Sequence, residues 1–534
     1  MIKEISGIKD IIQEGIKSGW KTWSGSRLEK DLTLEADVVI IGTGAGGGTA
    51  GEILSKAGLK VIMVEEGPLK SSNSFDMQED SAYSDLYQEG MARGSKDGAF
   101  TIMQGRCVGG STTVNWTSSF RTPEHTLHHW TEQHNLQGFS PSEMAPWFEM
   151  MEKRLNIGKW QQAPNANNQV LADGCSKLGY DWKVIPRNVS GCWNIGYCGL
   201  GCPTNAKQSM LVTTIPETLN HNGELVFSAL AEQLIIKDDK VTGVVCKGIK
   251  EDGVTPSGRT VTINAKHTVM ACGGINGPGL LLRSNAPDPH ELIGKRTFLH
   301  PVTFSVSEFK DKIEGYYGAP QSTYSDHFQW MNGATGPISY KLEVNPMQPA
   351  MMAAVIMGHG EQHREQMLNL SRMNSMIALL RDGFDEQSQG GSIELRPDNS
   401  PVVDYAFNDY LVDGLKRSLI TMAEIQFAAG ASRVRPVHTC ADFVSTLAEA
   451  KKQIQRLDFS PNSIRVGSAH VMGGCAMGAN EKEGVVNAMG QAFSLENLSI
   501  LDGSTFPTSI GANPQLSIYG MVAKQATALA KQLT

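Results

Sequence analysis

His470 and Asn513 are the residues near the carboxyl terminus whose types and setting could do chemistry. His470 stands in the glycine-rich turn Ser-Ala-His-Val-Met-Gly-Gly-Cys, and Asn513 stands directly before Pro514. A neutral imidazole can remove a proton from a hydroxyl group, and an amide held rigid before proline can hydrogen-bond the same oxygen. The pair therefore predicts an active site for a small hydroxyl compound. The alternatives are a structural histidine and a turn-forming asparagine.

A glycine-rich turn near the amino terminus predicts a dinucleotide-binding site. Residues 36–41 have the pattern of a fully buried strand, and Gly42, Gly44 and Gly47 follow it before a helical pattern begins. The first two glycines let the backbone approach a pyrophosphate, and the third lets helix and strand pack closely. Glu65 ends the next strand, where its carboxylate can accept hydrogen bonds from a ribose.

Further segments favour FAD over NAD as the dinucleotide. Residues 105–115 form a second glycine-rich loop, suited to a flat ring system or a diphosphate. Residues 271–284 have the pattern of a strand end, a glycine turn and a helix start, and Asp502 follows the strand-like residues 498–501. A single glycine fingerprint would not choose between the two dinucleotides, but this series needs the longer cofactor nearby.

Together these motifs resemble the glucose-methanol-choline (GMC) family of FAD-dependent oxidoreductases. The resemblance runs in order through residues 37–67, 105–115, 273–284 and 470–515, and it is weak in the middle of the chain. It implies an α/β fold, in which a Rossmann-like FAD-binding domain carries an inserted α+β substrate domain built on an antiparallel sheet. The FAD contacts that it implies are Gly42, Gly44, Gly47, Glu65, Gly109, Gly110, Asn115, Ala231 and Asp502.

His470 and Asn513 fall on the active-site pair of that family, in a form similar to cholesterol oxidase and the long-chain alcohol oxidases. The resemblance implies oxidation of a primary or secondary alcohol with a large apolar portion to an aldehyde or ketone. His470 is then the base, Asn513 orients the alcohol, and hydride goes to flavin N5. The alternatives are a sterol oxidase or sugar-type dehydrogenase of the same family, a flavoprotein electron-transfer subunit, and an NAD-binding protein. The electron acceptor is a quinone, a carrier protein or oxygen, with a dehydrogenase favoured.

Length and composition set the domain organisation and exclude some partners. A chain of 534 residues exceeds one ordinary core, and a net charge of −8 argues against nucleic acid. Since we find no apolar run of membrane-spanning length and no signal peptide, we expect a cytoplasmic protein, with contact to the inner face of the membrane as an addition. The predicted parts are an amino-terminal amphipathic segment (1–31), an FAD-binding domain (32–120, 205–305 and 460–534), and a substrate domain with a cysteine-rich loop (121–204 and 306–459).

Two features of the predicted substrate domain bear on the substrate. Methionines crowd into residues 347–376, and such flexible side chains suit either a pocket for a long apolar molecule or gaps in a core. Glu343 lies on the predicted strand 340–346. Cholesterol oxidase resembles this in having an active-site glutamate in its substrate domain, but we favour an exposed carboxylate on the strand face.

Three cysteines raise the question of a metal cluster. Cys192, Cys198 and Cys202 have the spacing C-x5-C-x3-C on a glycine-rich loop, and such thiolates can ligate an iron–sulfur cluster or zinc. The spacing resembles the three-iron cluster loop of some bacterial GMC sugar dehydrogenases. The alternatives are a loop like that of the long-chain alcohol oxidases, buried thiols, or one disulfide with a spare cysteine.

The amino-terminal residues carry a helical apolar period. Isoleucines and two tryptophans, Trp20 and Trp23, recur at steps of three and four over the first 23 residues. Such a face could lie in a membrane interface and meet a quinone or a lipid-like substrate. Because Gly7, Gly15 and Gly19 lower helix propensity, we favour packing on the protein's own surface.

Overall fold

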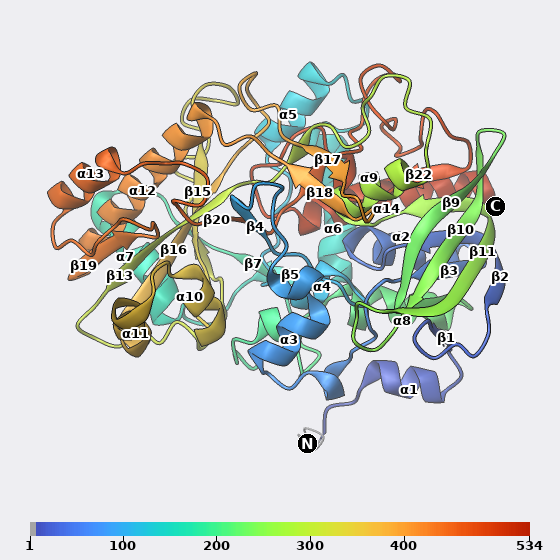
Figure 1. The fold of residues 1–534 in the computed structure, drawn as a ribbon, viewed down its shortest axis with the longest axis horizontal. Helices are drawn as coiled ribbons and strands as arrows, with labels where there is room; N and C mark the ends of the chain where they lie inside the picture. The colour runs from blue at the N-terminus through green and yellow to red at the C-terminus, as the bar shows by residue number, and fades with distance from the viewer. Residues whose placement is uncertain (1–6) are drawn as a thin grey trace.

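Two sheets at opposite ends of an elongated molecule organise the chain (Figure 1). The computed structural model describes residues 7–534. The larger sheet has eight strands in the order β1 (Lys21–Ser24), β8 (Glu224–Phe227), β3 (Val61–Val64), β2 (Leu32–Ile41), β11 (Pro256–Met270), β10 (Lys240–Ile249) and β9 (Ala229–Lys237), with β22 (Leu498–Ile500) also paired to β11. Neighbouring strands pair in parallel along the spatial order β1, β8, β3, β2 and β11, and β22 pairs in parallel with β11. Strands β9, β10 and β11 form an antiparallel meander.

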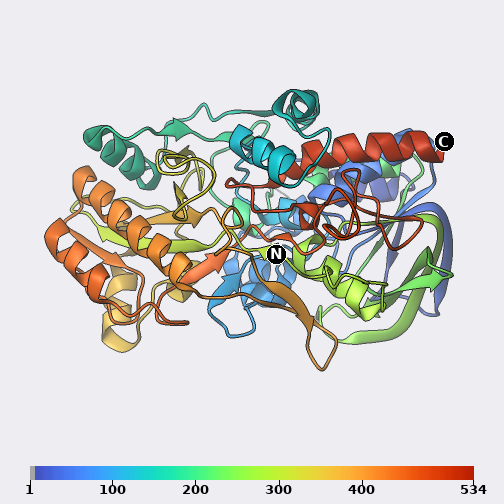
Figure 2. The same ribbon diagram turned by 90° about the horizontal axis from the view of Figure 1, so that it is seen from above.

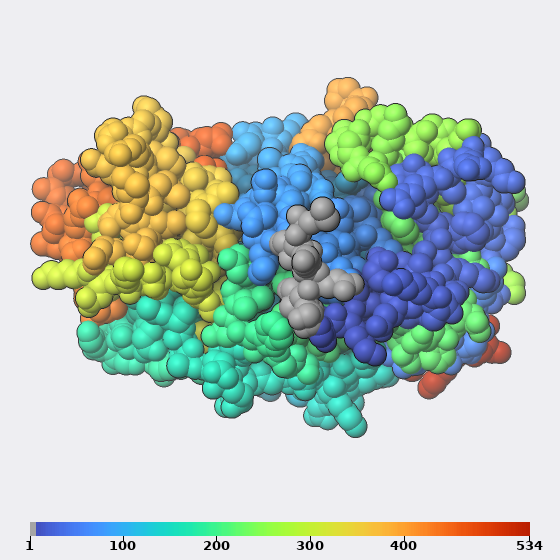
Figure 3. All heavy atoms as spheres, turned by 90° about the horizontal axis from the view of Figure 1, so that it is seen from below, coloured from blue at the N-terminus to red at the C-terminus, as the bar shows by residue number. Residues whose placement is uncertain are grey.

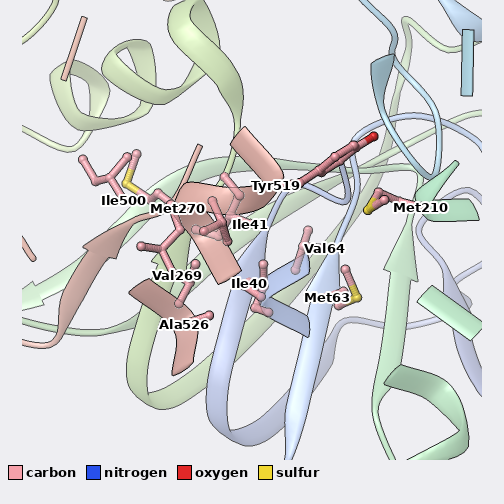
Figure 4. Close-up of a cluster of buried hydrophobic side chains, with 14 of the residues drawn as sticks. Ile40, Ile41, Met63, Val64, Met210, Val269, Met270, Ile500, Tyr519 and Ala526 are labelled. Atoms are coloured by element: carbon pink, nitrogen blue, oxygen red, sulfur yellow. The ribbon is translucent and has the colours of Figure 1, made fainter. Parts of the chain in front are cut away.

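The centre of the larger sheet is buried on both faces. Helices α2 (Ala45–Lys56) and α14 (Gln515–Leu533) pack on each other, and α14 spans this end of the molecule (Figure 2). Figure 4 shows side chains from β2, β3 and β11 meeting Tyr519 and Ala526 of α14. Burial of both faces explains why residues 38–41 are a continuous apolar run instead of an alternating one.

The strand register brings the loops that follow β2, β3, β11 and β22 to one edge of the larger sheet. Ile41 pairs with Val64 on one side and with Met270 on the other, and Met270 pairs with Ile500. Because these strands are parallel, their carboxyl ends coincide, which is where open α/β sheets bind ligands. The predicted glycine turn, Glu65, the turn at Gly273 and Asp502 therefore lie along this edge.

The smaller sheet is mostly antiparallel and has six strands. Their order is β15 (Tyr340–Val344), β16 (Met373–Leu380), β13 (Val302–Glu308), β20 (Val466–Ser468) and β4 (Phe100–Ile102), with β19 (Arg433–Pro436) also paired to β13. One face packs on helices α7 (Ala166–Leu178) and α12 (Asp409–Ala429), and α13 (Leu447–Arg456) packs outside α12. Along β16, Met376, Ala378 and Leu380 enter that core, so Ile377 and Leu379 face the other side.

Shorter elements connect and cover the sheets. The remaining helices are α1 (Ile11–Lys17), α3 (Glu79–Leu86), α4 (Ser111–Val114), α5 (Glu124–Gln133), α6 (Pro141–Arg154), α8 (Thr214–Asn220), α9 (Gly273–Arg283), α10 (Pro349–Val355) and α11 (Gly360–Leu368). Two-stranded pairs are β5 (Ile157–Lys159) with β7 (Pro186–Asn188), β6 (Lys183–Val184) with β14 (Thr323–Tyr324), β12 (Thr297–Phe298) with β21 (Met472–Gly473), and β17 (Ser392–Leu395) with β18 (Pro401–Asp404). No helix within residues 7–534 is both long and apolar enough to cross a bilayer.

The amino-terminal helix is shorter than the stretch of sequence over which the apolar pattern predicts it. Its first six residues lie outside the described part of the chain, and α1 ends at Lys17, before Gly19 with φ +108°. Trp20 and Trp23 therefore leave the helix, and the prediction that they finish one helical face is wrong. Their ring nitrogens donate hydrogen bonds to Asn220 and Glu224, at 2.9 and 3.0 Å.

Packing on the protein's own surface accounts for this segment. Ile12 is 2% exposed, and Asp10 caps α1 while also accepting hydrogen bonds from Ser71 Oγ and Asn73 N, at 2.7 and 3.0 Å. Beyond residue 6 the segment lies across the surface near one end of the molecule (Figure 3). The boundaries of the predicted domains stay a prediction, although each sheet has its own hydrophobic core.

Candidate active site

A cavity of about 810 Å³ lies where the carboxyl edge of the larger sheet meets the smaller sheet. It is lined by the predicted residues Gly42, Gly44, Glu65, Gly110, Asn115, Ala231, His470, Asp502 and Asn513. Gly47 and Gly109 lie behind this lining. The cavity therefore brings together segments that are separated by more than 400 residues in the chain, between Gly42 and His470.

Gly42, Gly47 and Gly110 leave no room for a side chain. Gly42 has φ +102°, and a Cβ there would overlap the carbonyl oxygen of Ala271. A Cβ at Gly47 would overlap the carbonyl oxygen of Gly42, as expected for a helix packed closely on its strand. Gly110 has φ +52°, and a Cβ there would lie 2.8 Å from the Cα of Gly44. The two glycine loops thus meet backbone to backbone at the cavity.

Glu65 ties these loops to the end of β3. Its carboxylate accepts hydrogen bonds from Thr43 Oγ1 at 2.6 Å and from Gly67 N at 3.0 Å, and Thr43 Oγ1 accepts one from Gly109 N at 2.9 Å. Burial raises the pKa of Glu65 to about 7. Since a carboxylate has about four acceptor positions, Glu65 keeps capacity for a ribose hydroxyl on the cavity side.

Glu66 is a cavity residue that the sequence analysis missed. It lines the cavity beside Glu65, is half-buried, and forms an ion pair with Arg106 of the second glycine loop. It also accepts hydrogen bonds from Gln88 and Asn276, at 3.3 and 3.4 Å. The consecutive Glu-Glu pair was the available signal, because successive residues at a strand end point in different directions.

Asp502 joins the carboxyl-terminal motif to the start of α9. Its two carboxylate oxygens accept hydrogen bonds from Gly273 N and Ser504 N, each at 2.7 Å. The negative charge stands at the amino end of α9, where the helix dipole favours it. Burial nevertheless raises the pKa of Asp502.

The second glycine loop is fixed from below by Lys207 and from the side by Gln515. The buried Lys207 ammonium donates hydrogen bonds to the carbonyl oxygens of Thr113, Asn115 and Cys198, and burial lowers its pKa to about 8. Asn115 Nδ2 donates to Gln515 Oε1 at 2.8 Å. The Asn115 side chain is thereby held at the cavity wall by the first residue of α14.

These groups fit FAD. Close-packed glycine turns at helix starts suit a diphosphate, and the carboxylates of Glu65 and Glu66 suit ribose hydroxyls on the same edge. The cavity extends from Ala231 at the meander to His470, so it offers a long site with separate ends. The contribution of each residue to FAD binding stays a prediction.

His470 lines the cavity and is half-exposed to it. Burial away from bulk water, followed by the positive charge of Lys341, lowers the pKa of His470 to about 3. The imidazole is therefore neutral at physiological pH, as a proton acceptor must be. Its Nδ1 lies 3.0 Å from Nδ1 of His300.

The contact between His300 and His470 restricts their tautomers. His300 is fully buried in the Leu-His-Pro segment, and its pKa lies well below the usual value because of burial. Two neutral rings that meet Nδ1 to Nδ1 must place one proton between them. If it sits on His470, then His470 Nε2 is a free base, while the His300 proton sits on Nε2, an atom with no hydrogen-bond partner among residues 7–534.

Asn513 lies in a buried charged network. Its Oδ1 accepts a hydrogen bond from Lys341 Nζ at 3.1 Å, and its Nδ2 donates one to Glu343 Oε2 at 3.2 Å. Lys341 and Glu343 form an ion pair of 2.8 Å. The expectation that Glu343 is exposed is wrong, because it is 0% exposed and β15 turns it toward Asn513. Lys341 supplies the countercharge that makes this burial affordable.

The wall of the cavity on the smaller sheet is apolar. Val302 and Phe304 of β13 pair with Leu379 and Ile377 of β16, and all four side chains line the cavity. Of the clustered methionines, Met351 of α10 lines it, whereas Met347, Met352, Met373 and Met376 are buried in the cores. Most of this cluster therefore fills gaps in the cores, and the apolar wall is built by branched and aromatic residues.

The cysteine loop shows no arrangement of metal ligands in the part of the chain that the structure describes. In residues 7–534, no three His, Cys, Asp or Glu side chains are placed to hold a metal ion. Each sulfur has a local partner instead: Cys192 accepts from Asn194 N, Cys198 from Arg187 Nη2, and Cys202 from Lys207 N. Residues 7–534 therefore give no support to the iron–sulfur alternative for this loop.

Comparison with known proteins agrees with the fold and the cavity. Sequence models of the GMC oxidoreductase family match residues 83–302 and 387–522, and a model of an FAD-binding domain matches residues 37–76. A long-chain-alcohol oxidase of Arabidopsis thaliana is 28% identical over 530 residues, covering 95% of this chain and 68% of that protein. A 6'''-hydroxyparomomycin C oxidase of Streptomyces lividus is 24% identical over 542 residues, covering 93% of this chain and 92% of that protein.

Solved structures share the fold at low sequence identity. A variant of formate oxidase from Aspergillus oryzae superimposes with a TM-score of 0.71 at 14% identity, covering 94% of this chain and all of that one. With the matched family models over most of the chain and the FAD-binding motif at one end of the cavity, the assignment is clear. The chain belongs to the GMC oxidoreductase family and is an FAD-dependent oxidoreductase.

Proposed function

We propose that this enzyme oxidises primary or secondary alcohols with a long apolar portion to aldehydes or ketones. The observation that carries the proposal is one cavity in which His470 and Asn513 stand beside the apolar wall of Val302, Phe304 and Leu379. A hydroxyl group can meet the polar pair while its chain lies on that wall. Relatives at 28% identity are long-chain-alcohol oxidases, which supports the same substrate class.

His470 removes the hydroxyl proton in this proposal, and Asn513 positions the oxygen. When bound, FAD supplies the hydride acceptor for the alcohol carbon. Nε2 of His470 is the free base in the tautomer that places the shared proton on its Nδ1. The second hydrogen of Asn513 Nδ2, left over from the bond to Glu343, can be donated to the alcohol oxygen.

The apolar wall sets the chain-length preference. Each methylene that leaves water contributes about 0.8 kcal/mol, so that three methylenes could raise kcat/KM by on the order of 50-fold. A hydrophilic sugar would instead leave its hydroxyl groups without partners on this wall.

We also propose that dioxygen is the electron acceptor. The sequence of the cysteine loop and of the amino-terminal segment favours a dehydrogenase, but within residues 7–534 the loop gathers no metal-binding group and α1 packs on the protein. The named relatives are oxidases, which favours oxygen.

The test is a substrate series with parallel acceptors. Straight-chain alcohols of graded length, a sterol and glucose are compared by kcat/KM, each with oxygen and with an artificial acceptor. We expect kcat/KM to rise with chain length, with peroxide formed under oxygen. A preference for glucose would overturn the substrate class, and activity with the artificial acceptor alone would overturn the choice of oxygen.

A further inference from the structure

We propose that Lys341, together with Glu343, is the positioning device that fixes the orientation of the Asn513 amide for the reaction. The inference rests on the proposed function, in which Asn513 holds the alcohol oxygen. Lys341 lies behind Asn513 and does not line the cavity, so apart from its charge, which helps to lower the pKa of His470, it acts on the substrate through Asn513.

The partners of the amide permit only one orientation. An ammonium group has donors and no acceptor, and an ionised carboxylate has acceptors and no donor. Asn513 must therefore turn Oδ1 to Lys341 and Nδ2 to Glu343, as the distances of 3.1 and 3.2 Å show. A flipped amide would oppose donor to donor and acceptor to acceptor at both contacts. Both charge-assisted hydrogen bonds would be lost.

The ammonium group of Lys341 is itself held in place by its neighbours. Its Nζ lies 3.1 Å from the ring centre of Phe120 and 4.5 Å from that of Tyr324. The ammonium is thus held by two aromatic faces, the carboxylate and the amide oxygen, and its side chain is 2% exposed. Few rotamers of a lysine satisfy all four contacts, so the amide meets a fixed donor.

Stability does not account for a buried ion pair at this place. Replacing such pairs by apolar residues is often neutral or stabilising, because the loss of hydration offsets much of the attraction. The neighbouring positions on β15, Leu342 and Val344, face the other way and are apolar core residues. Lys341 and Glu343 share the strand face that turns toward Asn513 and differ from their neighbours in that respect.

A double-mutant cycle tests the inference. Lys341→Met keeps the aliphatic stem and removes the ammonium, and it is combined with Asn513→Ala. We expect Lys341→Met to lower kcat by roughly 10- to 100-fold, the loss of one charge-assisted bond, with KM for a long alcohol little changed. In the Asn513→Ala background the same substitution should have a much smaller effect on kcat at a pH where His470 is neutral, because the amide through which the positioning acts is gone.

Two further variants serve as controls for the double-mutant cycle. Lys341→Met with Glu343→Gln removes both charges, so no unpaired charge remains buried if the single variant fails to fold. Flavin content and melting temperature are measured for every variant. Lys183→Met is the matched control. Lys183 Nζ lies 5.9 Å from the ring centre of Tyr324, one of the two aromatic rings around Lys341, but Lys183 pairs with Asp326 and not with Asn513. It should leave kcat unchanged.

The outcomes separate the two proposals. Wild-type kcat in Asn513→Ala would reject the role of Asn513 in the proposed function. A slow Asn513→Ala enzyme in which loss of the Lys341 charge causes an equal further decrease would reject only the positioning role. A decrease that largely disappears in the Asn513→Ala background, with flavin content retained, would support both.

Discussion

At the scale of single residues, the candidate base is prepared by its surroundings. Burial, and then the charge of Lys341, lowers the pKa of His470 to about 3, so the ring stays neutral where most enzymes work. A neighbouring imidazole, His300, shares a proton with it over 3.0 Å. Base strength and tautomer are therefore set by different neighbours, and each can be changed separately.

Removal of the base should slow turnover without releasing the cofactor. We expect His470→Ala to lower kcat by about 10² to 10⁴, the range for losing a general base. Stopped-flow reduction of the flavin by a long alcohol gives the measurement, and absorption of the purified protein checks its flavin content. Turnover close to wild type would place the base elsewhere.

His300 should matter through the tautomer of His470. His300 has φ +47° directly before Pro301, a backbone conformation that asparagine tolerates better than leucine. His300→Leu should lower kcat by roughly 10-fold, the value of one lost hydrogen bond near 1.4 kcal/mol, while His300→Asn keeps an oxygen acceptor and should lower it less. Equal kcat values in the two variants would argue against the tautomer role.

The pH profile should lack a step from His470 near neutrality. A base works when deprotonated, and a lowered pKa keeps it deprotonated down to about pH 3. Between about pH 8 and pH 5 we therefore expect kcat/KM to show no loss due to this ring, unlike a histidine with a pKa of about 6.5. The profile with a long alcohol decides this, and an acid limb that vanishes in His470→Gln would contradict it.

At the scale of elements, the strand pair β13 and β16 divides core from cavity by simple alternation. Ile377 and Leu379 face the cavity, whereas Ala378 between them enters the core with α7 and α12. The two faces of one strand therefore contribute to different parts of the molecule, the cavity wall and the core below α7 and α12.

Ile377→Asn should reduce the gain in kcat/KM per methylene. A polar side chain on the wall weakens the burial that contributes about 0.8 kcal/mol per methylene. Kinetics over the alcohol series measures the slope, and Ile377→Val, which keeps the wall apolar, is the control. An unchanged slope in Ile377→Asn would move the chain-binding wall to another part of the cavity.

The sequence predicted local features better than distant ones. Gly42, Gly44 and Gly47 could be found because a strand, a turn and a helix in one short segment dictate their spacing. Alternation predicted the strand around Glu343, but not which face is buried, since that depends on Asn513 and on the pairing with Lys341. The apolar period at the amino terminus was real, yet the left-handed turn at Gly19 ended its helix.

At the scale of the whole molecule, Asp502 joins the carboxyl-terminal motif to the start of α9 at the cavity. It accepts hydrogen bonds from the first residue of α9 and from the carboxyl-terminal Ser504. We expect Asp502→Ala to lower the free energy of unfolding by about 2 to 4 kcal/mol and to reduce flavin content. Denaturant unfolding and flavin absorption measure both. Asp502→Asn retains one acceptor, so its free energy of unfolding and flavin content should lie between those of the wild type and Asp502→Ala. Full flavin retention in Asp502→Ala would contradict the expectation.

The position of β22 in the larger sheet affects how the chain folds during synthesis. Strand β11 lies between β2 and β22, yet β22 is made after most of the chain has left the ribosome. At about 5 to 20 residues per second, roughly 20 to 90 s separate the synthesis of β2 from that of β22. During that time one edge of Thr268–Met270 has no parallel strand to pair with, and the face of α2 that packs on α14 is uncovered. Nascent chains of this enzyme should therefore need chaperone protection. FAD can stabilise the fold only after β22 and α14 have been synthesised.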